Sequence, residues 1–193
     1  MAMFARDLSV AHYRSFDSYR LVLDDGVTVL AGPNAAGKTN LIEALQLLTS
    51  GASFRHPTAT ELVHDGVGSC RVQLRLEGDG RVLDMGLSVE DGKRSFSRNG
   101  KKCSAAGVRG VLPSVLFCPD HLDMVKRGAS VRRAALDDFG VQLSARYADL
   151  ASAYGRCVTQ RNALLKESWC CREMLGAWNE SIARAGSALL VHR

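Results

Sequence analysis

Eight consecutive residues have the types and spacing that bind phosphate. They are Gly32, Pro33, Asn34, Ala35, Ala36, Gly37, Lys38 and Thr39, which match the pattern G-x-x-x-x-G-K-[ST]. In such a loop, backbone N–H groups at the start of a helix hold the phosphates. The lysine reaches the β- and γ-phosphates, and the hydroxyl of the next residue binds Mg²⁺. We therefore predict a nucleoside triphosphate site with ATP and Mg²⁺ as cofactors, Lys38 at the phosphates and Thr39 at the metal.

The residues on both sides of this loop predict the elements that must position it. Residues 27–31 are apolar and β-branched, as in a buried strand. Residues 39–49 carry leucine, isoleucine and alanine at helical spacing. A strand, a glycine-rich loop and a helix in this order indicate a binding site rather than a chance match. ATP and GTP both fit this loop.

Composition limits the classes of protein that fit the chain. Its 193 residues, 46% hydrophobic and 23% charged, are ordinary for a soluble globular protein with one domain or slightly more. No segment resembles a signal peptide or approaches the ~20 apolar residues that span a bilayer. The six cysteines and five histidines show no spacing typical of zinc ligands. We expect a cytoplasmic protein with reduced thiols and no membrane partner.

The chain on either side of the loop predicts mainly antiparallel strands. Alternating residues and turn signals predict strands over 3–10 and 19–23 and an antiparallel meander over about 69–103. A short apolar strand is predicted over 113–118. An antiparallel sheet beside a P-loop is typical of the ATPase heads of the ABC and SMC class. The predicted fold class is therefore α/β, a P-loop NTPase head of ABC/SMC type with an antiparallel β insert.

The sequence is helical in pattern from residue 130 almost to its end. One helix carries a heptad-like apolar seam, and a second is predicted from about 172 to 191. These helices either pack on their own domain or form an arm beside the ATPase head. We divide the chain into an amino-terminal lobe of the head, residues 1–128, and a helical arm subdomain, residues 129–193.

Positive charge is concentrated between residues 92 and 133. Ten lysines and arginines lie there against two aspartates, within a chain of formal net charge +5. Such a segment either neutralises nucleic-acid phosphates without reading the bases or is a solvated basic surface. The candidate DNA contacts are Lys93, Arg94, Lys101, Lys102, Lys126, Arg127, Arg132 and Arg133.

Four stretches resemble the RecF family of bacterial recombination-repair ATPases. The first is residues 8–17 with the run Tyr-Arg-Ser-Phe, and the second is residues 32–44, which read GPNAAGKTNLIEA. Ala35 stands there in place of a glycine that is commoner in such loops. The third and fourth stretches, residues 117–137 and 147–166, carry no generic motif and make the resemblance specific. Together they cover essentially the whole chain.

The resemblance implies a function in DNA replication, recombinational repair and the SOS response to DNA damage. A protein of this family is expected to bind single-stranded or gapped DNA, to work with RecO and RecR, and to support loading of RecA. ATP is expected to bridge two heads in a homodimer, and hydrolysis to release the DNA. These expectations come from the family and not from the charge or the spacing of residues.

Two motifs that hydrolysis requires in this superfamily are not found in the sequence. They are a Leu-Ser-x-Gly-Gln signature and an apolar strand that ends in a pair of acids. We therefore assign no catalytic residue and leave ATPase activity open. The resemblance implies that the chain corresponds to the amino-terminal half of a longer ATPase. For this chain we expect exposed apolar faces, poor solution behaviour and little turnover.

Three alternatives remain beside the RecF-like reading. The chain could be another ATPase head of SMC or ABC type, a P-loop nucleotide kinase or hydrolase, or a truncated fragment without function. The antiparallel insert and the helical tail disfavour a small-molecule kinase. Stabilisation by ATP that depends on DNA would separate the first reading from a kinase.

Overall fold

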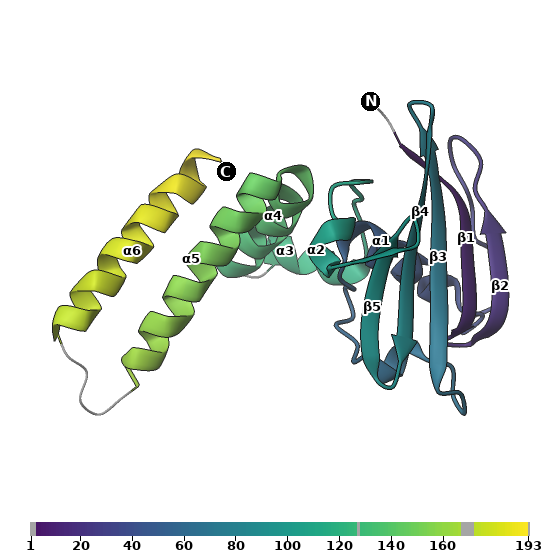
Figure 1. Ribbon diagram of the computed structural model, residues 1–193, viewed down its shortest axis with the longest axis horizontal. Helices are drawn as coiled ribbons and strands as arrows, with labels where there is room; N and C mark the ends of the chain where they lie inside the picture. The colour runs from purple at the N-terminus through teal and green to yellow at the C-terminus, as the bar shows by residue number, and fades with distance from the viewer. Residues whose placement is uncertain (1–2, 127, 167–171, 193) are drawn as a thin grey trace. The chain divides into compact units, whose positions relative to one another are not determined.

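The computed structural model describes residues 3–126, 128–166 and 172–192 (Figure 1). The chain forms two compact units, Met1–Leu116 and Phe117–Arg193. The first unit is a sheet with one long helix, and the second is helical. The domain boundary predicted between residues 128 and 129 lies further along the chain than the division between these two units. The assignment of the units to a lobe of the head and a helical arm stays a prediction.

The first unit is built on a six-stranded sheet of order β2-β1-β3-β4-β5-β6, in which all neighbours are antiparallel. The predicted meander over about 69–103 is confirmed by four strands connected by tight turns. Asn99 and Gly100 form the predicted turn before the last strand, both with positive φ. The strands are β1 (Phe4–Tyr13), β2 (Phe16–Val22), β3 (Ser69–Gly78), β4 (Arg81–Glu90), β5 (Lys93–Arg98) and β6 (Lys101–Cys103).

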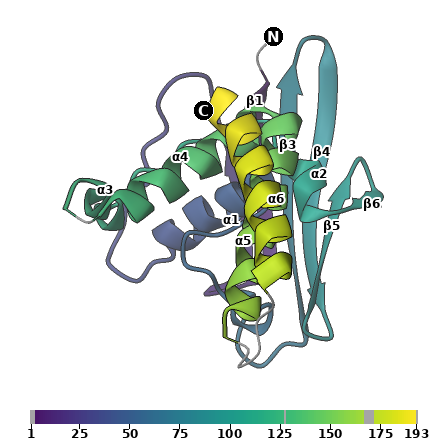
Figure 2. The same cartoon turned by 90° about the vertical axis from the view of Figure 1, so that its left-hand side faces the viewer.

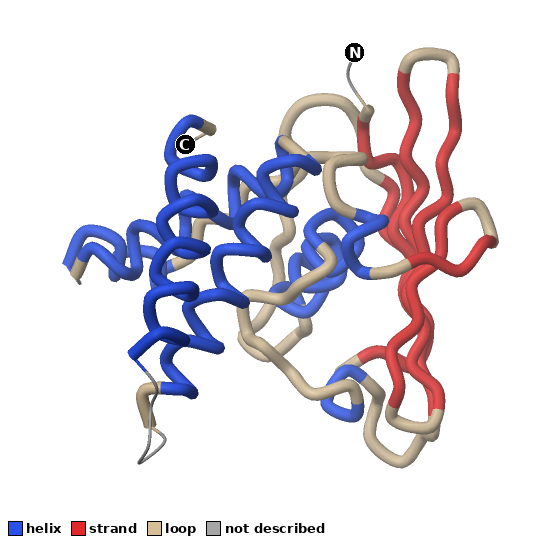
Figure 3. Tube along the Cα trace, turned by 60° about the vertical axis from the view of Figure 1, so that its left-hand side comes forward, coloured by secondary structure: helices blue, strands red, loops and turns tan. Residues whose placement is uncertain are grey.

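One face of this sheet forms the core of the unit. A cross-strand row of buried side chains runs through the register pairs Val10–Val72, Val72–Leu87 and Leu87–Phe96. Along β3 buried and exposed residues alternate strictly, so the opposite face of this strand meets solvent. Helix α1 (Lys38–Ser50) covers the buried face, as the blue helix beside the red strands shows in Figure 3.

Two segments that were predicted as strands are not strands. Residues 27–31 pair with none of the described strands, and Val27 and Val29 are 92% and 80% exposed. Residues 113–118 are likewise irregular, with Val115 72% exposed. A strand needs a neighbour for its backbone N–H and C=O groups, and the described sheet gives these segments none. Apolar, β-branched composition alone therefore produced the wrong prediction.

The second unit consists of helices. They are η2 (Pro119–Leu122), α3 (Asp123–Lys126), α4 (Ala129–Leu143), α5 (Ala145–Leu164) and α6 (Arg172–Val191). Helices α5 and α6 pack against each other, as Figure 2 shows, and Arg161 Nε donates to Asn179 Oδ1 between them at 2.7 Å. Few side chains are fully buried in this unit; among those described, Tyr147 and Leu189 are. In the described part of the chain, no helix is both long and apolar enough to cross a membrane.

Candidate nucleotide-binding site

The predicted phosphate-binding loop leads directly into α1. Gly37 precedes the helix with φ 91° and ψ 5°, a left-handed conformation that glycine adopts without steric cost. Ala35 also has a positive φ, 65°, which an alanine adopts only with strain. No described side chain caps this end of α1, and its first turn carries no acidic residue. The first N–H groups and the positive end of the helix dipole are therefore available to an anion.

Lys38 arches back over the loop. Its Nζ donates to the carbonyl oxygens of Gly32 and Pro33, at 2.7 and 2.6 Å. An ammonium group has three N–H donors, so one remains for a phosphate oxygen. Thr39 is exposed on the first turn of α1. A hydroxyl there suits Mg²⁺, a cation that prefers oxygen ligands and completes its shell with phosphates and water.

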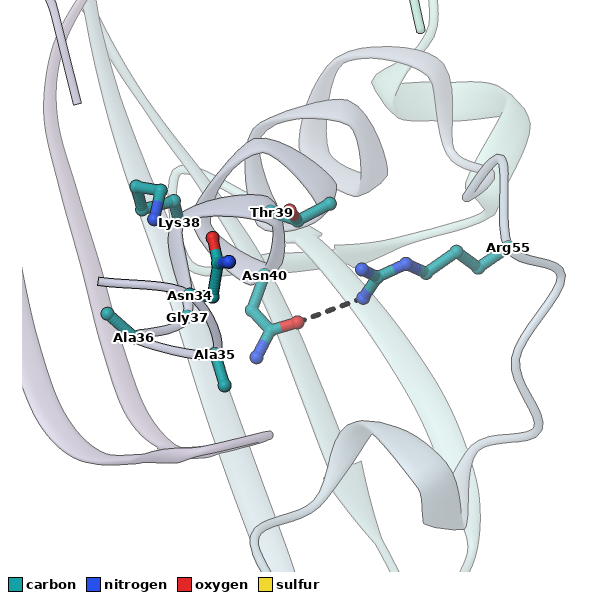
Figure 4. A pocket seen from close by; sticks show the side chains of 8 residues that line it. All are labelled: Asn34, Ala35, Ala36, Gly37, Lys38, Thr39, Asn40 and Arg55. Atoms are coloured by element: carbon teal, nitrogen blue, oxygen red, sulfur yellow. Dashed lines mark hydrogen bonds between the residues drawn. The ribbon is translucent and has the colours of Figure 1, made fainter. Parts of the chain in front are cut away.

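The loop lines one side of a solvent-open cavity of about 320 Å³. Its lining residues are Asn34, Ala35, Ala36, Gly37, Lys38, Thr39, Asn40 and Arg55. Figure 4 shows Arg55 approaching the mouth of this cavity from a separate loop, with Nη1 donating to Asn40 Oδ1 at 2.9 Å. Gly32 and Pro33, which were predicted as part of the site, contribute through the carbonyl groups that hold Lys38.

A buried carboxylate contacts Arg55, one of the residues that line the cavity. Glu43 on α1 is fully buried and accepts hydrogen bonds from four side chains. Arg14 donates to both of its oxygens, at 3.0 and 3.1 Å, and Ser53 Oγ donates at 2.6 Å. Tyr13 Oη and Arg55 Nη1 lie further away, at 3.3 and 3.5 Å. Glu43 thus connects β1, α1 and the loop that carries Arg55.

Burial and the charge of Glu43 change the pKa values of the two residues that contact it from the end of β1, Tyr13 and Arg14. Burial, together with the negative charge of Glu43, raises the pKa of Tyr13 well above its usual value. For Arg14, burial opposes the charge, but the hydrogen bond and the charge of Glu43 outweigh it and raise the pKa. Tyr13 therefore stays a neutral donor and Arg14 a cation. The buried carboxylate is paired and hydrogen-bonded, as its burial demands.

The turn between β1 and β2 packs on the start of α1. Ser15 Oγ accepts a hydrogen bond from Asn40 Nδ2 at 3.0 Å, and the Phe16 ring lies against Gly37. The run Tyr-Arg-Ser-Phe, which the sequence offered only as part of a family resemblance, therefore supports the loop physically. Arg55 and Glu43 were missed as site residues. A carboxylate on the apolar face of the predicted helix was the signal for Glu43; nothing local marked Arg55.

The candidate DNA contacts do not form a single group. Lys101 and Lys102 lie on β6 beside the Asn99–Gly100 turn, and both are exposed. Lys93 and Arg94 lie at the far end of β5, where Arg94 donates to the carbonyl oxygen of Pro57.

Further candidates belong to the helical unit. Lys126, Arg132 and Arg133 are exposed there. Arg127 lies outside the described residues. Among the described residues, no cluster of histidine, cysteine and acidic side chains could hold a metal ion without a nucleotide.

Known proteins match almost the whole chain. The AAA domain family matches residues 7–108, which is more than half of the sequence. The DNA replication and repair protein RecF of Streptomyces avermitilis is 33% identical over 99% of this chain and 54% of its own length. RecF of Pseudarthrobacter chlorophenolicus is 35% identical over 97% of this chain and 49% of its own length. The chain thus spans about half the length of the curated relatives it matches.

Solved structures agree with the sequence comparison. The recombination mediator protein RecF of the RecFOR pathway, solved as RecF-ATPrS and as RecF-ATP, matches with TM-scores of 0.89 and 0.87 at 28% identity. Each match covers 98% of this chain and 53% of the other. The expected resemblance to RecF and the expected fold class, a P-loop ATPase head of ABC/SMC type, are confirmed.

Proposed function

Because this chain belongs to the AAA domain family and resembles RecF over almost its entire length, we propose that it binds ATP at residues 32–39 and acts in DNA replication and repair. The observation that carries the proposal is the geometry of the loop. A left-handed Gly37, a helix start without a side-chain cap and a lysine folded over the loop together form an anion site. The similarity to a RecF-ATP structure supports ATP as the ligand whose phosphates occupy this site.

Titration with a fluorescent ATP analogue in the presence of Mg²⁺ tests the nucleotide site. We expect saturable binding that weakens at least about tenfold in Lys38→Ala, since a charge-assisted contact contributes about 1.5–3 kcal/mol. Lys166→Ala, which removes an exposed lysine of the helical unit, is the matched control and should bind like the wild type. Equal affinity of Lys38→Ala and the control would contradict the proposal.

Mg²⁺ belongs to the same proposal and has its own test. The Thr39 hydroxyl would be its protein ligand, beside the phosphate oxygens and water. Thr39→Val keeps the shape of the side chain and removes the hydroxyl. We expect chelation of Mg²⁺ to weaken ATP binding in the wild type and to have a smaller effect in Thr39→Val. An equal effect of chelation in both proteins would show that Thr39 is not a ligand.

We also propose that the basic side chains contact the DNA backbone. Lys101 is paired with Arg98 in the register of β5 and β6, so these two basic side chains share a face of the sheet, and the neighbouring Lys102 is exposed as well. Lys93, Arg94, Lys126, Arg127, Arg132 and Arg133 remain candidates of lower priority. Phosphate contacts hold DNA without reading its sequence, in keeping with single-stranded or gapped DNA as the ligand.

Fluorescence anisotropy with labelled gapped DNA tests this pair. Replacing Lys101 and Lys102 together by alanine should weaken binding uniformly across sequences. It should also reduce the slope of log K against log salt by about one for each lost contact. Lys166→Ala serves again as the control. An unchanged salt slope in the double variant would assign DNA binding to other residues.

The protein partners and the homodimer are proposed from the resemblance to RecF. We propose RecO and RecR as protein partners and loading of RecA onto DNA as the outcome, with a homodimer that forms when ATP is bound. Light scattering with and without ATP tests the dimer directly. A mass that is the same in both conditions would exclude it for this chain.

A further inference from the structure

The turn between β1 and β2 has an unusual backbone conformation. His12 and Arg14 both lie in the left-handed region, with φ of 50° and 53°. Residues with a side chain adopt this conformation at an energetic cost, and such strain persists only where the surrounding structure imposes it. The shape of the turn therefore depends on contacts from elsewhere in the fold.

Residues 62–64 lie alongside the end of β1 and supply backbone contacts to the turn. The His64 N–H donates to the carbonyl oxygen of His12 at 2.8 Å, and the Arg14 N–H donates to the carbonyl oxygen of Leu62 at 3.0 Å. An isolated antiparallel bridge lies between these two bonds. Most residue types could make such backbone contacts at position 64, so they do not explain why a histidine is there.

The side chain of His64 adds a contact of its own. Its Nδ1 lies 2.6 Å from the carbonyl oxygen of Arg14. A carbonyl oxygen only accepts hydrogen bonds, so Nδ1 carries the proton and donates it. Nε2, on the other side of the ring, lies 3.5 Å from Oδ1 of Asp17. The half-buried imidazole therefore reaches the first residue of the turn and also the strand that follows it.

The same turn supports the phosphate-binding loop. Ser15 Oγ accepts a hydrogen bond from Asn40 Nδ2, and the Phe16 ring lies against Gly37. Gly37 and Asn40 flank the two residues that we expect to bind the phosphates and Mg²⁺. If the turn moved away, both contacts would be lost and the start of α1 would no longer be fixed. Fewer molecules would then have the loop ready for a phosphate, and the apparent affinity for ATP would fall in proportion.

We propose that His64 is a positioning residue of the nucleotide site, whose Nδ1–H holds the carbonyl group of Arg14 and thereby keeps the β1–β2 turn against the start of α1. This inference rests on the proposed function, since it needs a nucleotide at residues 32–39. His64 is not among the described residues that line the cavity. It therefore acts on ATP binding through the turn and not by contact with the ligand.

Binding of a fluorescent ATP analogue in the presence of Mg²⁺ tests the donor on Nδ1. His64→Leu removes it, whereas His64→Asn places an amide N–H at the same distance from the backbone. We expect His64→Leu to weaken binding about fivefold or more and His64→Asn to bind within about twofold of the wild type. His192→Leu, at an exposed histidine of the helical unit, is the control and should not change the affinity. Equal losses in His64→Leu and His64→Asn, or no loss in His64→Leu, would overturn the assignment.

Hydrogen exchange of backbone amides without nucleotide shows whether the effect of His64 reaches the loop. His64→Leu should increase exchange over residues 14–16 and also over 36–40, while the amides of β3 keep the wild-type rate. An increase over 14–16 alone, or an equal increase over the whole sheet unit, would mean that His64 only stabilises its surroundings, and the proposal would fall. Thermal unfolding shows whether each variant is folded during the titration. If His64→Leu is not folded, His64→Gln, whose amide lies one bond further from the backbone, replaces it with the same criteria.

The variant Lys38→Ala separates this inference from the proposed function. If the wild type does not bind ATP, or Lys38→Ala binds as well as the wild type, the nucleotide site itself is wrong. If Lys38→Ala loses ATP and His64→Leu does not, the site stands and the inference about His64 falls.

Discussion

The aromatic ring of Phe16 lies against the backbone of Gly37 so closely that a Cβ on residue 37 would overlap two of its ring atoms. The ring comes from the first residue of β2, and the glycine directly precedes α1. The edge of the antiparallel sheet thus fixes the start of the helix that carries the phosphate-binding loop. Sheet and nucleotide site form one packed structure at this point.

Gly37→Ala should abolish ATP binding and destabilise the fold. The new Cβ would meet the Phe16 ring and Ser15 Oγ, and φ 91° is unfavourable for alanine. We expect a loss of about 2 kcal/mol or more in the free energy of unfolding, measured by chemical denaturation. Gly66→Ala is the matched control, because φ there is +82° and no atom lies within 4 Å of the added Cβ. Equal losses in the free energy of unfolding for Gly37→Ala and Gly66→Ala would show that the contact of Phe16 with residue 37 does not matter for stability.

Arg14→Met should destabilise the protein far more than Arg20→Met. Arg14 pairs with the fully buried Glu43, whereas Arg20 pairs with Asp7 at the surface, where its own side chain is 72% exposed. Loss of Arg14 leaves the buried carboxylate with only the longer, 3.5 Å contact to the Arg55 cation and should cost about 3–5 kcal/mol. Loss of the exposed pair should cost far less, because solvent and salt screen its charges. Chemical denaturation measures the loss in the free energy of unfolding for each variant. Similar losses in Arg14→Met and Arg20→Met would contradict a stabilising role of the contacts around Glu43.

Cys70 should resist thiol reagents until the protein unfolds. Burial raises the pKa of its thiol from 9.0 to about 11, so at pH 8 the reactive thiolate is scarce. The half-buried Cys103, Cys118 and Cys157 should react before it. Because the folded pKa of Cys70 is the higher one, the unfolded chain loses this proton first as pH rises. Stability should therefore decline between about pH 9 and 11, and less so in Cys70→Ala. Rapid labelling of Cys70 in the folded protein would be inconsistent with its burial.

Val29→Ser should improve solution behaviour without a loss of stability. Val29 is 80% exposed, so its replacement should change the free energy of unfolding by about 0.5 kcal/mol or less. Fewer exposed apolar side chains should reduce self-association, measured by sedimentation. Val72→Ser is the control, because Val72 is fully buried in the sheet core and its loss should cost about 2–4 kcal/mol. Unchanged self-association in Val29→Ser would show that other surfaces cause it.

Local patterns predicted the parts of the fold that depend on neighbouring residues. The alternation of Val72, Leu74 and Leu76 specified β3, and the Asn99–Gly100 turn specified the last hairpin. The loop over residues 32–39 could be singled out for the same reason, since all its parts lie within eight residues, and its role in phosphate binding stays a prediction. Whether an apolar segment becomes a strand depends instead on a partner elsewhere. Residues 27–31 have the composition of a strand and no described partner, so their prediction failed.

The buried charge cluster was beyond local patterns. Arg14 lies 29 positions before Glu43 in the sequence, and Arg55 lies 12 positions after it. Only the fold brings these three residues together. The isolated carboxylate on an apolar helix face was a clue to a buried pair, but several arginines could have been its partner. A single sequence therefore predicts that Glu43 needs a cation and not which one.

The segment before the phosphate-binding loop has a thermodynamic consequence for ligand affinity. On its helical side the loop is fixed by α1 and Phe16, whereas residues 27–31 have no backbone ladder to any described strand. A strand that pairs on folding loses about 1 kcal/mol of conformational entropy per residue, whereas residues 27–31 have Leu30 packed on the core but no ladder to a described strand. If ATP binds only those molecules in which this side of the loop is already in the binding conformation, the apparent affinity for ATP is reduced in proportion to the fraction of such molecules. Preorganisation of five residues upstream would then help to set, together with the phosphate contacts, how tightly ATP is held.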